Sequence, residues 1–240
     1  MQTRSMDDLK IKLFADGADK EGMLKLYRDP RIQGFTTNPT LMRKAAVADY
    51  EAFARDILEA IPDRPISFEV FSDEFGDMRR QACKIAGWGE NVYVKIPVTN
   101  TAGESAAALV KELAASGVKL NVTALLTPKQ VACIAEAMAG GPRGVISVFA
   151  GRIADTGVDP GPLMAESLEI VRPHANIELL WASCRELLNI FQADAVGCHI
   201  VTVTNDILKK LPMVGKDLTE LSRDTVCMFR EDAVKAGYAL

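Results

Sequence analysis

The chain has 240 residues, of which 48% are hydrophobic, and its formal net charge is −4 at pH 7. That length suffices for one large domain with a substantial core, and single α/β barrels routinely have about this length. The acidic balance, without a long basic run, argues against nucleic acid and anionic membranes as partners, so any anion site must be local and built from a few arginines.

The cysteines and histidines indicate the compartment and argue against a metal site. Five cysteines occur, none in a C-x-x-C pair, which fits reduced thiols in a cytoplasmic protein better than a disulfide scaffold or a zinc site. His174 and His199 form no metal-ligand pair, so we expect no metal. No run approaches the ~18–20 apolar residues of a membrane span, and the N-terminal MQTRSMDDLK has no apolar signal core. We therefore expect a soluble cytoplasmic protein.

Short apolar runs alternate with amphipathic stretches along the chain. In chain order, the predicted strands are IKLFAD (11–16), IQGFTT (32–37), ISFEVF (66–71), NVYVKIP (91–97), VKLNVTA (118–124), GVISVFAG (144–151), IELLWAS (177–183) and CHIVTV (198–203). Several of the stretches between them open with a capping residue and end at Gly, as helices do. This alternation implies βαβ units and a parallel sheet.

The number of repeats predicts the architecture. Eight strand–helix repeats at this length predict a closed (β/α)8 barrel that forms a single domain over residues 1–240. A doubly wound open sheet is the alternative, but no glycine-rich dinucleotide fingerprint follows the first strand. The tail from Lys216 to Ala236 is predicted to form one long final helix, which could cover the barrel or dock on a neighbouring subunit.

Polar side chains recur on one face of most predicted strands, near the carboxyl end. Side chains alternate along a strand, so Lys95 opposes the aliphatic residues of NVYVKIP and Glu69 opposes the apolar residues of ISFEVF. In a barrel, inward residues at this end line the active-site mouth. Burying unpaired charges is costly, so a polar cavity explains the pattern best. The residues concerned are Asp16, Thr36, Asn38, Glu69, Lys95, Asn121, Thr123, Ser147 and Ser183.

The residue types in this predicted cavity suit imine chemistry on a phosphorylated sugar. Desolvation disfavours an ammonium, and the neutral amine of a buried lysine such as Lys95 attacks carbonyls to form Schiff bases. Asp16 and Glu69 supply carboxylates for proton transfer, although Asp16 could instead cap the following helix. Arg152 and Arg185 follow the sixth and seventh strands and could bind a phosphate. Groups for a polyhydroxylated ligand come from Thr36, Asn38, Asn121, Thr123 and Ser147.

Six segments of the chain resemble a known family. FADGAD, GFTTNPTL, VYVKIPVT, LNVTALLT, SVFAGRI and ASCR resemble the transaldolase family, in the right order and at the ends of predicted strands. The resemblance spans nearly the whole chain, and TTNPTL combined with VKIP and a downstream NVT is a specific pattern. The length, without long insertions, is similar to the short branch that includes fructose-6-phosphate aldolase.

The resemblance implies catalytic roles. Lys95 is implied to be the Schiff-base lysine, and Asp16 to exchange a proton with the C4 hydroxyl during carbon–carbon cleavage. Glu69 is implied to handle a catalytic water that Thr123 helps to position. The ketose is cleaved, the aldehyde leaves, and a dihydroxyacetone unit stays as an enamine until an acceptor aldehyde takes it. The resemblance implies no cofactor.

The resemblance also implies which residues bind substrate. The aldolase branch typically has Gln where Glu69 stands and Tyr where Phe149 stands, so this pair favours transfer between sugar phosphates over release of free dihydroxyacetone. The implied donors are of the fructose 6-phosphate or sedoheptulose 7-phosphate type. The implied contacts are Asn38 and Asn121 for donor hydroxyls, with Thr36, Ser147 and Phe149 nearby, and Arg152, Ser183 and Arg185 for the phosphate.

Two departures from the family pattern keep alternatives open. Glu186 stands where the family often has Asn, which leaves room for a modified sugar with a different terminal group, and Val148 stands where Pro is common. A non-catalytic sugar-phosphate-binding protein is disfavoured because the lysine and both carboxylates are present. Short members of the family often assemble into rings, so a homo-oligomer is implied.

Overall fold

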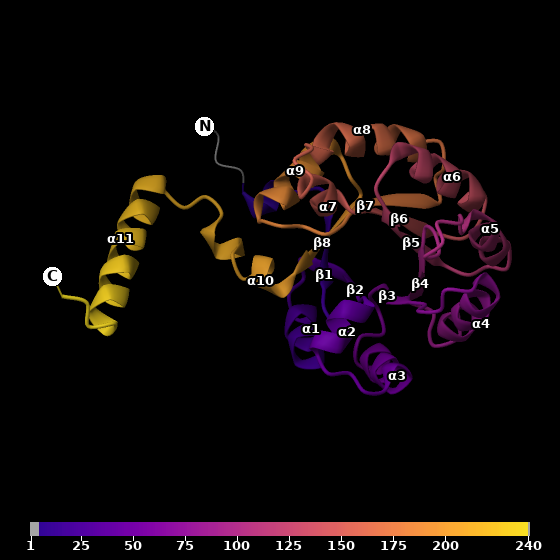
Figure 1. Cartoon of the computed structure of the whole chain (residues 1–240), viewed down its shortest axis with the longest axis horizontal. Coiled ribbons are helices and arrows are strands. Elements are labelled where there is room, and N and C mark those ends of the chain that lie inside the picture. The colour runs from indigo at the N-terminus through magenta and orange to yellow at the C-terminus, as the bar shows by residue number, and fades with distance from the viewer. Residues whose placement is uncertain (1–4, 240) are drawn as a thin grey trace.

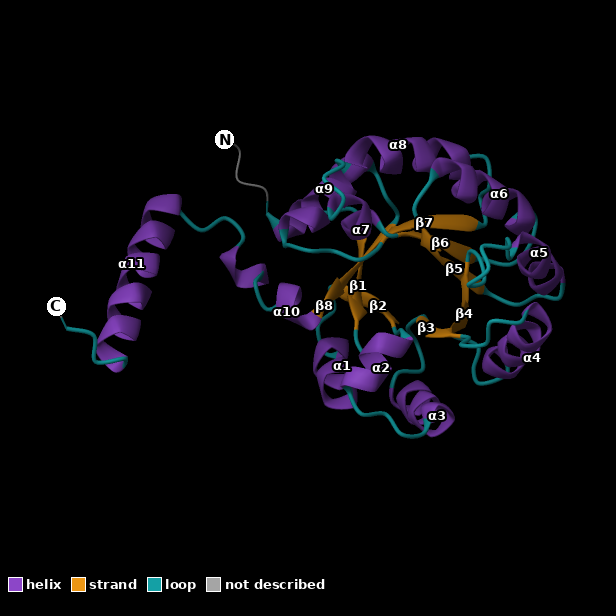
Figure 2. Cartoon of the chain, in the orientation of Figure 1, coloured by secondary structure: helices purple, strands orange, loops and turns teal. Residues whose placement is uncertain are grey.

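The computed structural model describes residues 5–239, in which eight parallel strands form a closed barrel surrounded by helices (Figure 1, Figure 2). The strands follow one another around the barrel in chain order, and the first strand closes the ring by pairing with the last. The strands are β1 (Lys12–Asp16), β2 (Ile32–Thr36), β3 (Ile66–Glu69), β4 (Val92–Pro97), β5 (Leu120–Leu125), β6 (Gly144–Val148), β7 (Ile177–Trp181) and β8 (Ile200–Thr204).

The helices from α1 to α9 lie between consecutive strands on the outside of the barrel, and α10 and α11 follow the last strand (Figure 2). Short 3-10 helices span Met6–Asp8 and Leu211–Met213. The α-helices are α1 (Lys20–Tyr27), α2 (Pro39–Lys44), α3 (Tyr50–Ala60), α4 (Phe75–Ala86), α5 (Ala107–Ala115), α6 (Pro128–Met138), α7 (Ala150–Ala154), α8 (Pro160–Val171), α9 (Leu188–Val196), α10 (Asn205–Leu208) and α11 (Leu218–Lys235).

The predicted (β/α)8 barrel is confirmed, and each predicted apolar run overlaps one strand. The open-sheet alternative is wrong because β1 pairs with β8. Some strand ends differ from the prediction: the run predicted over residues 144–151 leaves the sheet after Val148, and its last two residues begin α7. Four apolar residues at the end of a run are compatible with either a strand or a helix, which is why the sequence alone did not separate them.

Alternation along the strands produces two apolar layers. One side of each strand packs against the surrounding helices, as Val94 and Ile96 do at 0% exposure. The other side faces the barrel axis, where a smaller apolar cluster fills the middle of the barrel and divides its two ends. The buried members of this inner cluster are Phe14, Val145, Leu180, Ala182 and Ile200.

The last helix lies apart from the barrel. The predicted final helix is present as α11, and Figure 1 shows it projecting from the barrel beyond α10. None of its residues is buried, and one of its sides carries exposed apolar side chains such as Leu218, Val226 and Phe229. No helix of the described part of the chain is both long enough and apolar enough to cross a membrane.

Candidate active site

A cavity of about 430 Å³ lies at the carboxyl ends of the strands. This is the end of a barrel at which enzymes of this architecture hold their substrates. Ten of the predicted site residues line it, namely Asp16, Thr36, Asn38, Glu69, Lys95, Thr123, Ser147, Phe149, Arg152 and Ser183. The remaining two, Asn121 and Arg185, lie outside its lining.

Lys95 lies inside the barrel with its side chain held by two oxygen atoms. β4 pairs with β3 so that Lys95 is level with Glu69, and the Lys95 Nζ lies 3.0 Å from the Glu69 Oε2. The same Nζ donates a hydrogen bond of 2.9 Å to the backbone oxygen of Thr37. Lys95 is only 5% exposed. A carboxylate in contact with a buried lysine can accept its proton and return it, which is what a lysine nucleophile requires.

Asp16 lies across the cavity at the end of β1. Its Oδ1 accepts a hydrogen bond of 2.7 Å from the Thr36 hydroxyl, and Thr36 is also 2.6 Å from the hydroxyl of Thr202 on β8. Burial raises the pKa of Asp16 above its ordinary value, and the nearby Lys95 charge and the Thr36 hydrogen bond oppose this rise. A carboxyl group with a raised pKa is suited to gain and lose a proton during catalysis.

The alternative interpretation of Asp16 as a helix cap is wrong. Asp19 caps α1, because its side chain accepts a hydrogen bond from the backbone nitrogen of Gly22. Asn38 does serve as a cap, since its Oδ1 accepts a 3.0 Å hydrogen bond from Leu41 at the start of α2. That bond leaves the amide nitrogen of Asn38 as the group that can donate to a ligand in the cavity.

Asn121 lies on β5 beside Lys95 but outside the cavity lining. Its Nδ2 donates a 3.0 Å hydrogen bond to Ser67, and its Oδ1 accepts a 2.7 Å hydrogen bond from Ser147, which itself lines the cavity. Asn121 is therefore linked to the cavity through Ser147, and its predicted contact with substrate hydroxyls stays a prediction. The alternation of side chains correctly placed Asn121 on the inner face of β5. Alternation alone does not say which inward side chains reach the cavity.

Thr123 presents a free hydroxyl close to Lys95. Its Oγ1 is buried and has no hydrogen-bond partner among the described residues, although the residue lines a polar cavity. Buried hydroxyls are nearly always bonded, so this one is available to a ligand or to a reacting water. The next residue, Ala124, has a positive φ of 65°, and Ser183, which also lines the cavity, has a φ of 64°. Strained backbone of this kind is concentrated at functional sites.

The two predicted anion-binding arginines differ in position. Arg152 on α7 lines the cavity, with its guanidinium carbon 5.6 Å from the centre of the Phe149 ring. The Nε of Arg185 instead lies 3.0 and 3.1 Å from the two carboxylate oxygens of Asp155. These hydrogen bonds lower the pKa of Asp155 below its ordinary value. Arg185 therefore stands at the rim with its charge compensated, and the neighbouring Glu186 is exposed.

Two residues of the site were missed by the sequence analysis. Thr202 lines the cavity, and the alternation of side chains along the last strand would have found it. Tyr50 of α3 donates a 3.0 Å hydrogen bond to the backbone oxygen of Glu69 and accepts one of 2.8 Å from its backbone nitrogen. Tyr50 thereby fixes the backbone at the end of β3, next to Lys95. Nothing in the local sequence marks a helix tyrosine for this contact.

Neither thiol chemistry nor a metal cluster is indicated near the cavity. Burial raises the pKa of Cys184 to about 12, so its thiol stays protonated near neutral pH. Within residues 5–239, no group of three or more His, Cys, Asp or Glu side chains is arranged to hold a metal ion.

Comparison with known proteins shows which family the chain belongs to. The family model described as transaldolase/fructose-6-phosphate aldolase matches residues 13–240. A probable transaldolase of Thermoanaerobacter sp. is 32% identical over 228 residues, which cover 95% of this chain and 99% of the relative. A probable transaldolase of Pelotomaculum thermopropionicum is 34% identical over 88% of this chain and 93% of its own length.

A third relative agrees with these two. A probable transaldolase of Dehalococcoides mccartyi is 31% identical over 84% of this chain and 90% of its own length. The barrel, the cavity at the carboxyl ends of its strands and the family match all cover the same part of the chain. The chain therefore belongs to the transaldolase/fructose-6-phosphate aldolase family.

Proposed function

We propose that this protein is a transaldolase that moves a dihydroxyacetone unit from a ketose phosphate to an aldose phosphate through a Schiff base on Lys95. The observation that carries the proposal is the contact between the buried Lys95 Nζ and Glu69, inside a cavity that also holds Asp16. Three titratable groups with these roles are what imine-based carbon–carbon cleavage needs.

The proposed reaction begins with proton transfer from Lys95 to Glu69. The neutral amine attacks the C2 carbonyl of the ketose to form a carbinolamine, and Glu69 returns the proton to the hydroxyl group, which leaves as water. Asp16 then accepts the proton of the C4 hydroxyl as the C3–C4 bond breaks. The aldehyde departs, and the electron pair of the C3–C4 bond stays with the three-carbon unit, which remains attached to Lys95 as an enamine.

The second half of the proposed reaction runs these steps backwards. The enamine carbon attacks the carbonyl of an acceptor aldose, and Asp16 gives its proton to the new hydroxyl. Water, activated by Glu69 and placed by the free hydroxyl of Thr123, then hydrolyses the imine and releases the new ketose. Each group returns to its starting protonation state, as a catalyst must.

The cavity walls support a polyhydroxylated substrate with an anionic end. Asn38, Ser147 and Thr202 offer donors and acceptors around the reacting end. Arg152 and Ser183 line the far wall, and we propose that they hold the phosphate with Arg185 at the rim. Because Arg185 is already ion-paired with Asp155, its charge is partly compensated. A modified sugar with another terminal group therefore stays an alternative substrate.

A second candidate activity is aldol cleavage with release of free dihydroxyacetone. Glu69 and Phe149 favour transfer, because Phe149 has no hydroxyl that could act as an acid to discharge the enamine. Purified protein should convert fructose 6-phosphate only when an acceptor aldose phosphate is present, and Lys95→Ala should abolish the conversion. Rapid release of dihydroxyacetone without an acceptor would contradict transfer. Turnover by Lys95→Ala would instead support a site that works without a Schiff base.

We also propose that the protein works in the cytoplasm as a homo-oligomer. The exposed apolar side of α11 supports assembly, because a helix with no buried residues is seldom stable away from a partner. The exposed free cysteines Cys83, Cys133 and Cys227 support a reducing compartment.

A further inference from the structure

A second cavity, at the opposite end of the barrel, has the composition of an anion site. It has a volume of about 380 Å³ and lies at the amino ends of β1, β6, β7 and β8, next to the loop that follows α8. The apolar cluster inside the barrel stands between this cavity and the Lys95 cavity. Its charged and imidazole side chains are Lys12, Arg143, Arg172, His174, Glu178 and His199.

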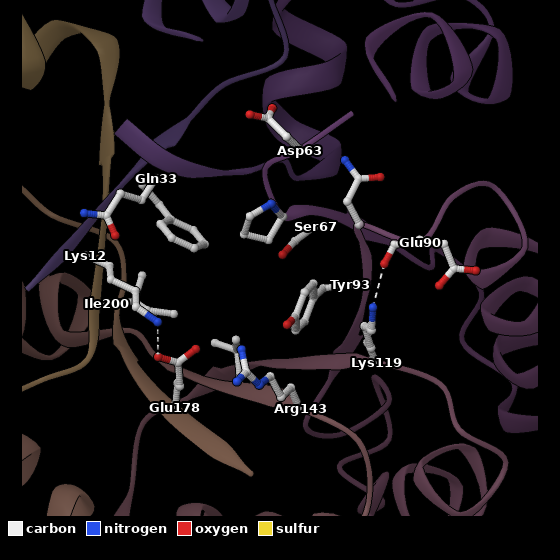
Figure 3. Close-up of a pocket in the computed structure, with 14 residues that line it drawn as sticks. Lys12, Gln33, Asp63, Ser67, Glu90, Tyr93, Lys119, Arg143, Glu178 and Ile200 are labelled. Carbon is white, nitrogen blue, oxygen red and sulfur yellow. Dashed lines mark hydrogen bonds and ion pairs between the residues drawn. The ribbon is translucent and has the colours of Figure 1, made fainter. Parts of the chain in front are cut away.

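The charge of this lining is opposite to that of the whole chain. The protein carries a net charge of −4, but three cationic side chains line the cavity and Glu178 is the one carboxylate among its described lining residues. Glu178 is engaged by Lys12, whose Nζ lies 2.7 Å from its Oε1. Figure 3 shows this pair beside Arg143, in an adjoining hollow that shares all three residues.

Among the cations that line this cavity, Arg143 is the one that no described carboxylate pairs with. Within residues 5–239, its guanidinium has no ion-pair or hydrogen-bond partner, and the side chain is exposed just before β6. A guanidinium presents a fork of donors that fits a phosphate or carboxylate bidentately. Arg172, which also lines the cavity, is ion-paired with Glu169, which does not line it.

His199 is held so that it offers a donor. Its Nδ1 accepts a 3.0 Å hydrogen bond from the backbone nitrogen of Leu179, so the neutral ring must carry its proton on Nε2. The backbone nitrogen of His199 also donates to the Leu179 oxygen at 3.1 Å, which fixes the residue beside β7. The Nε2–H is therefore the free polar group of a ring that lines the cavity.

We propose that this amino-end cavity binds a small phosphate-bearing anion, at a site separate from the Lys95 cavity. Arg143 is the principal contact and His199 donates through its Nε2, while Lys12 and Arg172 line the same cavity with their charges paired to Glu178 and Glu169. The volume accommodates a phosphate together with a small organic group, such as that of a sugar phosphate. This proposal does not depend on the transaldolase activity.

The imidazole resonances of the two histidines can be used to measure anion binding in this cavity. They are the two histidines of the whole sequence, and both line this cavity, so the imidazole proton resonances of the full-length protein report on it directly. Inorganic phosphate and glucose 6-phosphate should each be titrated at pH 8 and constant ionic strength. At that pH an imidazole of ordinary pKa, about 6.5, is already neutral, so a shift reports binding and not protonation.

The expected result is a saturable shift of both resonances. Arg143→Gln should weaken the affinity about ten- to hundredfold, as loss of a charge-assisted hydrogen bond does. Arg28→Gln is the matched control, because Arg28 is also exposed but lines neither amino-end cavity. Arg152→Gln, in the other cavity, should leave the shifts intact. A tighter response to glucose 6-phosphate than to phosphate would identify a phosphate ester as the ligand class.

Two results would overturn the proposal. One is a shift that rises linearly with added anion, without saturation. The other is an Arg143→Gln variant that responds as the Arg28→Gln control does. In the second case, loss of the shifts in Arg152→Gln would assign phosphate binding to the Lys95 cavity alone.

Discussion

Asp16 is the residue whose environment is most clearly set up for proton transfer. Burial raises its pKa against the opposing charge of Lys95, while Thr36 fixes the orientation of its carboxylate. In the proposed reaction, Lys95 and Glu69 form the imine on one wall of the cavity, and Asp16 acts from another strand. The proposed division of work predicts that loss of Asp16 stops carbon–carbon cleavage but leaves imine formation intact.

Asp16→Asn should lower kcat by about 10²- to 10⁴-fold, the usual contribution of a general acid or base. The variant should still form a borohydride-trappable adduct with a ketose, because Lys95 and Glu69 are unchanged. Asp19→Asn, three residues along, is the control: asparagine caps a helix as well as aspartate does, so activity should persist. Equal losses in the two variants would show that Asp16 has only a structural role.

The same substitution should change stability in a pH-dependent way. A raised pKa means that the folded protein binds the Asp16 proton more tightly than the unfolded chain does. The resulting penalty is absent below the ordinary value of 3.8 and grows as the pH rises towards the folded pKa. Asp16→Asn should therefore raise the free energy of unfolding at pH 7, and denaturant titrations should show this gain shrinking as the pH falls towards 3.8.

At the scale of elements, the contact between α7 and the turn after β7 shapes the far wall of the cavity. A Cβ added at Gly151 would lie 1.6 Å from the backbone oxygen of Ser183. The backbone nitrogen of Gly151 also donates a 3.3 Å hydrogen bond to Ala182. The glycine thus lets α7 bring Arg152 close to Ser183, the two residues proposed to hold the phosphate.

Gly151→Ala should destabilise the protein by about 1–3 kcal/mol, the usual cost of overpacking. It should also raise KM for phosphorylated substrates, because the Ser183 turn must move. Gly76→Ala in α4 is the matched control, since nothing lies within 4 Å of an added Cβ there. Thermal unfolding and steady-state kinetics of both variants check this. A Gly151→Ala variant with unchanged KM would show that the turn does not position the anion.

The periodicity of the sequence was enough to predict the strands and the inner polar face, but not the contacts made across elements. Lys95, Glu69 and Asp16 each end up in the cavity because alternation along a strand is a local property. Arg185 donates a hydrogen bond to Asp155, thirty positions earlier in the chain, and Tyr50 on α3 donates one to the backbone of Glu69. Such pairs depend on how loops and helices pack, which a pattern within one segment does not contain.

At the scale of the whole molecule, α11 is the part that the barrel leaves uncovered. Phe229 is 64% exposed and Val226 is equally so, on a helix without a buried residue. The final helix was predicted from its sequence, but its distance from the barrel was not, because an amphipathic pattern does not say which surface covers it. A second copy of the chain is the partner that we propose.

Phe229→Asp should shift the protein from an oligomer towards a monomer, because a carboxylate on the apolar side of α11 opposes burial. Cys227→Asp is the control, since it adds the same charge on another side of the helix and should leave assembly unchanged. Light scattering after size-exclusion chromatography measures both. A wild-type protein that elutes as a monomer at micromolar concentration would contradict the proposed assembly.

The two ends of the barrel carry different proposed tasks, and the apolar cluster around Phe14 and Leu180 stands between them. At one end, a buried lysine and two carboxylates are arranged for imine chemistry. At the other end, cations and both histidines surround a cavity that the proposed reaction does not use. The fold thus permits a binding site that does not disturb the chemistry.

The most direct test of the account is to find the residue that forms the covalent intermediate. The protein should be incubated with fructose 6-phosphate, reduced with borohydride, digested and mapped by mass spectrometry. The account predicts one stable adduct, on the peptide that contains Lys95, and none in Lys95→Ala. An adduct on another lysine, such as Lys119, or the absence of any adduct from an active preparation, would contradict the Schiff-base mechanism.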